Sequence, residues 1–211
     1  MALLHQATLT PTKLELLSSW LSSQPWLDGA DTSAVTSVGA YRFDDPDGEV
    51  GIETHLLKTA DGRTLQVPVT YRAAPLSNAE SLLIGTTQHS VLGKRWVYDG
   101  CGDVVYVTAL AATILNGGHE APLDVVTDDG LVRREATTKV SGSGTHHGEV
   151  NVREPLTYES RGSETHVKAD NFELVLVRVI NEESVDVPHD ELRGTWVGQY
   201  NPIRLAFIIA P

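Results

Sequence analysis

The fold is decided by residues 63–100, RTLQVPVTYRAAPLSNAESLLIGTTQHSVLGKRWVYDG. β-Branched and aromatic residues cluster there between breakers, which predicts strands over 64–71 and 81–89 and a third strand around Trp96. Gly93 predicts the tight corner between the second and third strands. Three short strands in succession are typical of an antiparallel meander. No nucleophile motif, metal-ligand set or phosphate loop lies in this stretch, so its residue chemistry alone does not indicate a function.

Two helices flank the meander. Thr12 and Glu15 have capping-box spacing, and leucines then recur at i, i+3 and i+7, which predicts a helix over 12–22. Asp103 is a favourable N-cap for a second helix over 104–115, which a pair of glycines ends. With antiparallel strands between them, the predicted fold class is α+β, mainly a curved antiparallel β-sheet with two main helices.

Further strands are expected on both sides of this region. Turn residues at 44–48 and 60–62 predict two consecutive hairpins upstream of the meander. The strands predicted outside the meander cover residues 34–43, 50–58, 123–126, 131–140, 150–152, 165–168, 172–180 and 203–209. Residues 181–193 are interpreted as an acidic connector. We expect a first portion over 1–118 and a β-rich second portion over 119–211, packed as one unit.

Composition limits the function classes. The 211 residues include 28 acidic and 16 basic side chains, for a formal net charge of −12. That charge opposes binding to nucleic acid or to an anionic membrane surface. One cysteine, Cys101, excludes an intramolecular disulfide, and we interpret it as a packed core residue. Without a signal sequence or an apolar span of about 20 residues, the chain is expected to be cytoplasmic.

Several motifs suggest chemistry, but each has a simpler structural interpretation. His146 and His147 suggest a metal site, although a third ligand is lacking and a solvated hairpin tip explains them. The loop at 141–148 and the loop Ser160, Arg161, Gly162 and Ser163 suggest phosphate cradles, and two β-hairpin turns are the alternative. The carboxylates at 44–49 suggest calcium, but a turn explains them. Trp26 and Trp196 are candidates for an exposed surface on which a sugar stacks.

Several segments together resemble the N-terminal cap domain of maltokinase and the small stand-alone proteins that carry such a cap. The similarity is dense over residues 9–115. The segments that carry it are PTKLELL (11–17) with WL (20–21) and QPW (24–26), DPDGEVGIE (45–53), VPVTYRAAPL (67–76), LIG (83–85) and RWVYDG (95–100). None of these motifs is catalytic.

Residues 153–180 are similar, more loosely, to the intermediate part of the kinase N-terminal lobe. The resemblance implies a nucleotide site with Ser160, Arg161, Gly162 and Ser163 as its loop. The lysine expected in the following apolar strand is missing, and Lys168 or Arg178 is the candidate replacement.

The resemblance also implies what the chain does. Kinases of this family carry their catalytic aspartate and magnesium ligands in a helical C-terminal lobe, with motifs such as H-G-D and D-F-E, which this chain echoes only superficially. We therefore expect a non-catalytic protein without a cofactor, linked to trehalose, maltose and glycogen metabolism. It would dock a partner enzyme or an α-glucan on the cap sheet. The alternative is an ATP-binding half-kinase completed by a separate chain.

Overall fold

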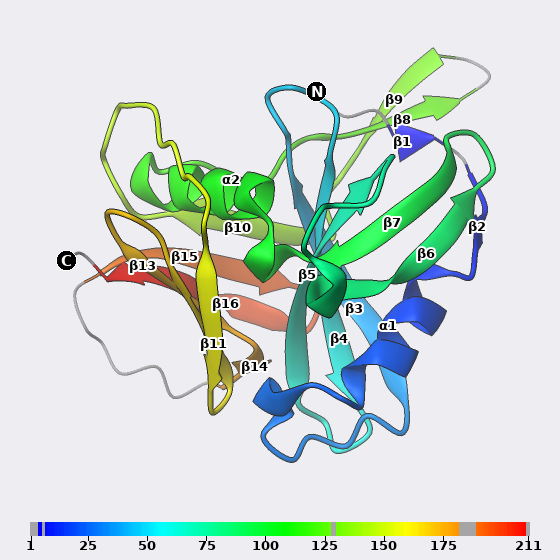
Figure 1. Ribbon diagram of the computed structural model, residues 1–211, viewed down its shortest axis with the longest axis horizontal. Helices are drawn as coiled ribbons and strands as arrows, with labels where there is room; N and C mark the ends of the chain where they lie inside the picture. Colours follow the sequence, from blue (N-terminus) through cyan, green and yellow to red (C-terminus); the bar gives the residue numbers. More distant parts are fainter. Residues whose placement is uncertain (1–3, 6, 128–129, 182–188, 210–211) are drawn as a thin grey trace.

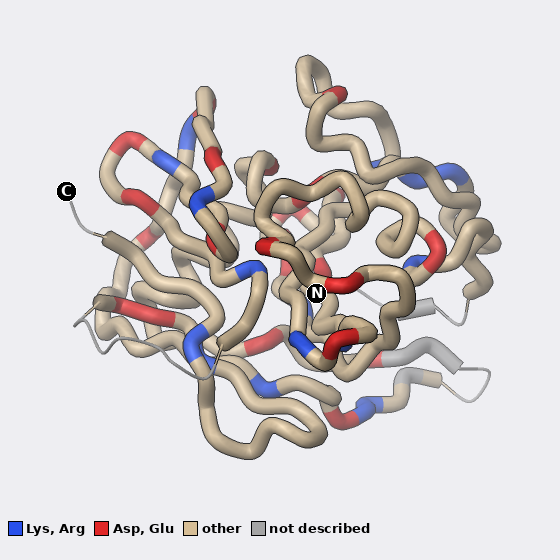
Figure 2. Tube along the Cα trace, turned by 90° about the horizontal axis from the view of Figure 1, so that it is seen from below, with Lys and Arg blue, Asp and Glu red and all other residues tan. Residues whose placement is uncertain are grey.

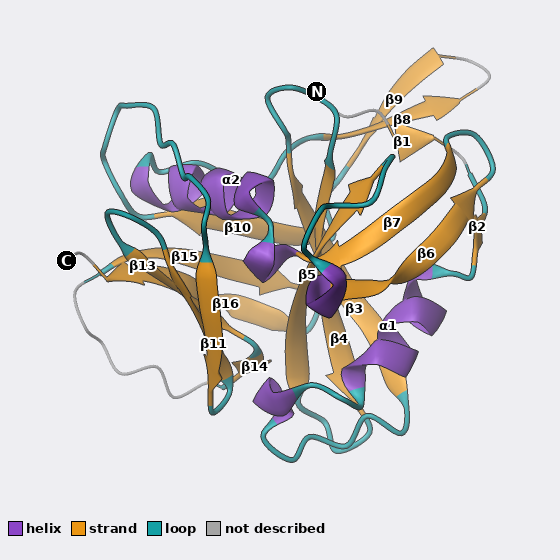
Figure 3. Cartoon of the chain, viewed as in Figure 1, coloured by secondary structure: helices purple, strands orange, loops and turns teal. Residues whose placement is uncertain are grey.

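The fold was analysed in a computed structural model that describes residues 4–5, 7–127, 130–181 and 189–209. The described residues form three β-sheets and two α-helices (Figure 1), and most of their regular structure is strand (Figure 3). The predicted α+β class is therefore confirmed. The helices are α1 (Lys13–Leu21) and α2 (Val104–Leu115), with short 3-10 turns η1 (Pro25–Leu27), η2 (Glu80–Leu82) and η3 (Gly100–Gly102).

The largest sheet contains the three strands predicted between residues 63 and 100. Its order is β2 (Leu9–Thr10), β6 (Leu83–His89), β7 (Gly93–Asp99), β5 (Thr64–Arg72), β4 (Gly51–Thr59) and β3 (Val35–Phe43), with β14 (Val179–Ile180) paired to β5. All of its pairings are antiparallel. Both predicted upstream hairpins are confirmed. The predicted meander is wrong, because β5 pairs with β7 and β6 lies on the far side of β7.

The second portion of the chain forms most of the other strands. A six-stranded antiparallel sheet has the order β10 (Thr138–Gly142), β15 (Asp190–Trp196), β16 (Gln199–Ile209), β13 (Glu173–Val177), β12 (Glu164–Lys168) and β11 (Thr157–Arg161). A small sheet joins β1 (Leu4–His5), β8 (Leu123–Thr127) and β9 (Gly130–Arg134). The strand β13 has partners on both sides, as its continuous apolar sequence predicts.

Four predictions for this half were wrong. Residues 150–152 form no strand. They lie beside α2 as a strap without regular structure. The strand predicted over 131–140 divides into β9 and β10, which belong to different sheets. The strand over 172–180 is interrupted at Arg178, where the chain passes from β13 to β14. Residues 190–193 of the predicted connector begin β15, whereas 182–188 lie outside the described residues.

The helices begin where their caps predict. At α1 the Thr12 side chain accepts from the Glu15 backbone, and the Glu15 carboxylate accepts from the Thr12 backbone N–H at 2.8 Å. At α2 the Asp103 carboxylate accepts from the backbone N–H of Val105 at 3.0 Å. Such caps satisfy N–H groups that the helix itself leaves unpaired.

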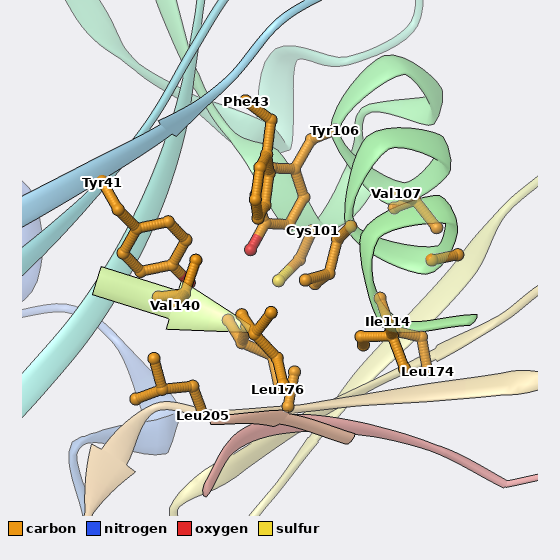
Figure 4. Packing of buried hydrophobic residues seen from close by; sticks show 14 of the residues in the cluster. Tyr41, Phe43, Cys101, Tyr106, Val107, Ile114, Val140, Leu174, Leu176 and Leu205 are labelled. Atoms are coloured by element: carbon orange, nitrogen blue, oxygen red, sulfur yellow. The ribbon is translucent and has the colours of Figure 1, made fainter. Parts of the chain in front are cut away.

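Two hydrophobic clusters cover the two faces of the seven-stranded sheet. One face packs under α1 and η1 through Leu17, Leu21 and Trp26. The other face packs against α2 and the six-stranded sheet, and Figure 4 shows Tyr41 and Phe43 in this cluster with residues of α2 and of the second sheet. Residues from both sides of the predicted boundary at 118 contribute to it. Cys101 is fully buried there, so its interpretation as a core residue is confirmed.

Candidate functional site

The predicted phosphate loop is the tight turn between β11 and β12. Arg161 pairs with Glu164 in the register, so Gly162 and Ser163 simply close the hairpin. The guanidinium of Arg161 is bound by the carboxylates of Glu159 and Glu173. Lys168 lies at the far end of β12, about 13 Å of strand away from the turn. The hairpin interpretation of Ser160, Arg161, Gly162 and Ser163 is confirmed.

Arg178 is an interior residue. Its side chain is 1% exposed, and its guanidinium donates to both carboxylate oxygens of Asp99, at 2.6 and 2.8 Å, and to the Thr165 hydroxyl at 2.8 Å. The guanidinium also lies over the ring of Trp26, 4.8 Å from its centroid. The prediction that Arg178 contacts a nucleotide phosphate is therefore wrong, because the ion pair joins the two portions of the chain inside the protein.

Neither tryptophan offers a stacking surface. Trp26 is 2% exposed, between Trp20 and Arg178, and Trp196 is 8% exposed within the core. The prediction of an exposed sugar-stacking surface at these residues is wrong, because each ring packs into a hydrophobic cluster. Other parts of the chain pack on both broad faces of the seven-stranded sheet.

The glycine-rich loop at 141–148 packs tightly on the C-terminal end of α2. Backbone N–H groups of Gly144 and His146 donate to the carbonyls of Ile114 and Leu115 at 2.9 and 2.8 Å. A Cβ at Gly144 would lie 2.2 Å from the Leu115 carbonyl oxygen, so only glycine allows this approach. Because these N–H groups are already engaged, the loop is no phosphate cradle, and it is no hairpin turn either. Among the described residues, no group of three His, Cys, Asp or Glu side chains is arranged for a metal.

A groove of about 890 Å³ runs along the exposed side of α2. One wall is the turn from Asp44 to Asp47, and the opposite wall is the strap from Gly148 to Val152. The floor comes from one side of α2, whose residues here are mostly small: Val104, Val105, Thr108, Ala109, Ala112, Thr113 and Asn116. Small side chains on a helix leave room for a ligand to approach it.

The walls of the groove are held by hydrogen bonds. The Asp45 carboxylate accepts from the backbone N–H groups of Asp47, Glu49 and Val50, at 3.2, 3.0 and 2.9 Å. The interpretation of these carboxylates as turn residues is confirmed for Asp45. At the other end, the Glu120 carboxylate accepts from the backbone N–H of Val140 at 2.8 Å. These hydrogen bonds fix the shape of both walls.

Hydrogen-bond acceptors dominate the chemistry of the groove. The lining includes acidic residues of the Asp44–Asp47 turn together with Glu120 and Glu149, and the described lining holds no lysine or arginine. Asn116 donates its side-chain N–H to the Gly148 carbonyl at 3.2 Å, while its buried Oδ1 has no partner among the described residues. Such a site favours a ligand that donates hydrogen bonds and disfavours an anion.

A known family matches the part of the chain that forms most of the seven-stranded sheet. Residues 20–103 match the family model of the maltokinase N-terminal cap domain. The match ends at Asp103, the N-cap of α2, and includes the strands from β3 to β7. The predicted resemblance is thus confirmed over this segment. No curated protein matches the chain. Among the described residues, no helix is both long and apolar enough to cross a membrane.

Sequence reasoning missed the groove residues. Thr108, Ala112 and Asn116 follow one another at the helical spacing of four, and this stripe of small side chains was the available signal. The strap that completes the groove was not predictable, because it reads as a strand in the sequence.

Proposed function

We propose that this chain is a non-catalytic, cytoplasmic binding protein of maltose and trehalose metabolism that holds an α-glucan in the groove along α2. The observation that carries the proposal is the acceptor-rich groove beside the unpartnered Oδ1 of Asn116. The match of residues 20–103 to the maltokinase cap supports the link to this metabolism.

The chemistry of a glucan suits the groove. Each glucose unit presents several hydroxyl donors, and hydrogen bonds from hydroxyls to carboxylates are stronger than those between neutral groups. The carboxylates would repel a phosphorylated ligand such as ATP. A volume of about 890 Å³ lies near the upper end of small-molecule sites, which favours an oligosaccharide over a single sugar.

The test is calorimetric titration of the protein with maltose, trehalose and maltoheptaose. We expect the longest glucan to bind most tightly. Ala112→Trp places an indole in the groove and should abolish binding, whereas Lys168→Trp, on the exposed end of β12, should leave binding unchanged. Asn116→Ala removes one acceptor and should weaken binding about three- to tenfold.

A partner enzyme is the other occupant that the sequence predicts. It would have to bring a basic segment to this acidic groove, and its binding would weaken strongly with salt, unlike that of a neutral glucan. No detectable binding of any glucan, or unchanged glucan binding by Ala112→Trp, would contradict the proposal.

A further inference from the structure

A band of charged side chains crosses the seven-stranded sheet on the face that α1 covers. Arg42 on β3 lies opposite Glu53 on β4, and Tyr71 on β5 is diagonal to Glu53 in the register. Arg95 on β7 is two residues from Val97, which pairs with Tyr71, so alternation places Arg95 on the same face. Lys13, from the first turn of α1, completes the band.

The carboxylate in this band is already neutralised. The ammonium of Lys13 lies 2.5 Å from Glu53 Oε2, and His55 Nε2 lies 3.5 Å from the same oxygen. Burial raises the pKa of Glu53, but the charges of His55 and Lys13 outweigh burial and lower this pKa to about 2. Burial lowers the pKa of His55, whose Nε2 lies 3.2 Å from the Tyr71 hydroxyl.

The side chains of the charged band line a cavity of about 260 Å³, which is separate from the groove along α2. Its charged lining consists of Lys13, Arg42, Arg95 and Glu53, while Leu92 contributes an apolar wall. Three cations and one carboxylate leave a charge of +2. In a chain with a net charge of −12, in which acidic residues are spread over the whole trace (Figure 2), this concentration of cations is unusual.

The two arginines are available to a ligand. Within the described part of the chain, neither Arg42 nor Arg95 forms an ion pair with a carboxylate, although Arg95 donates to the Lys94 carbonyl at 3.0 Å. Both side chains are only partly buried. A planar guanidinium presents a fork of donors that matches two oxygens of a phosphate or a carboxylate.

We propose that this cavity binds a small phosphate monoester, with the phosphate between Arg42 and Arg95 and the organic part against Tyr71 and Leu92. A phosphate monoester carries a charge between −1.5 and −2 at pH 7, by general values, which matches the cavity, whereas a single carboxylate would compensate only half. The proposal does not rest on glucan binding, because it uses a different cavity and different residues.

Calorimetric titration with glucose 6-phosphate, inorganic phosphate, glucuronate and glucose tests the proposal on the full chain. We expect glucose 6-phosphate to bind most tightly and glucose not to bind. Arg95→Gln and Arg42→Gln should each weaken binding at least tenfold. Lys94→Gln makes the same charge change one residue away, on a side chain whose ammonium lies over the Trp96 ring, and should alter binding less than twofold.

Three outcomes would overturn the proposal. They are the absence of binding by every phosphorylated probe, glucuronate binding as tightly as glucose 6-phosphate, and equal losses in Arg95→Gln and Lys94→Gln. Thermal melts of each variant exclude misfolding as the cause, and Arg95→Lys separates charge from fork geometry because it should restore binding only in part. Ala112→Trp should bind glucose 6-phosphate normally, which keeps this test distinct from that of the groove.

Discussion

Arg178 and Arg95 show how the fold gives arginines opposite roles. Arg178 is 1% exposed and donates to both oxygens of Asp99, so its charge is neutralised inside the protein. Arg95 lines a cavity whose carboxylate, Glu53, already forms an ion pair with Lys13. A buried arginine with its own carboxylate stabilises the assembly of the chain, whereas an arginine without one is free to recognise an anion.

The largest effect is expected from breaking the Arg178 site. Asp99→Asn keeps the shape of the side chain but leaves a buried guanidinium without its counter-charge, which costs about 3–5 kcal/mol of unfolding free energy. Urea denaturation measures the loss. Glu159→Gln removes a carboxylate from the exposed Arg161 and should leave the unfolding midpoint nearly unchanged. Equal effects of the two variants would contradict the structural role of the buried pair.

The cavity is expected to respond to acid through Glu53. Its pKa of about 2 in the folded protein lies below its ordinary value of 4.5, so its contribution is full above pH 4.5 and is lost as the pH falls toward 2. That contribution is at most about 3 kcal/mol. The lowered pKa of His55 acts in the same direction, because the unfolded chain binds its proton more readily.

Urea denaturation between pH 7 and pH 2 measures this dependence. Glu53→Gln should have a flatter curve below pH 4.5, whereas Glu49→Gln, at an exposed turn position, should follow the unmodified protein. Parallel curves for Glu53→Gln and the unmodified protein would show that the carboxylate is not held by Lys13 and His55.

A smaller effect is expected at the cap that positions Lys13. Thr12→Ala removes the side-chain acceptor of the α1 capping box and should cost about 1 kcal/mol. Ser18→Ala, in the middle of the same helix, should be neutral or slightly stabilising, since alanine is the better helix former. The pair of variants is compared by thermal unfolding, and an equal melting temperature would contradict the cap.

The smallest effect is expected from removing Arg95. Because Arg95 has no carboxylate partner in the described structure, Arg95→Gln should change the unfolding free energy by less than about 0.5 kcal/mol. A loss as large as that of Asp99→Asn would show that Arg95 is also structural. ATP with magnesium should likewise leave the melting temperature unchanged, because the Arg178 guanidinium is buried on Asp99 and Lys168 lies at the end of β12 away from the hairpin turn.

The local part of the fold was predictable from the sequence. The capping box at Thr12 and the cap at Asp103 predict both helices, because caps and periodicity act over a few residues. The apolar run containing Arg178 predicts a strand, but it does not reveal that Asp99, 79 residues away, neutralises the arginine. The prediction that Trp26 is exposed failed for the same reason, since its burial depends on segments distant in sequence.

The sites were much less predictable. Arg42, Glu53, Tyr71 and Arg95 come from four strands, and only the pairing register brings them to one face. The signal in the sequence was weak: Glu53 and His55 are ionisable residues two positions apart, on one face of β4. The groove depends on the strap over α2, which no local pattern predicts.

The comparison of the two arginine sites is tested most directly by an amide chemical-shift titration of the isotope-labelled protein with glucose 6-phosphate. We predict shifts at Arg42, Tyr71 and Arg95 that saturate together, and none at Arg161 or elsewhere in the β11–β12 hairpin. Shifts confined to that hairpin, or none at all at millimolar ligand, would contradict it.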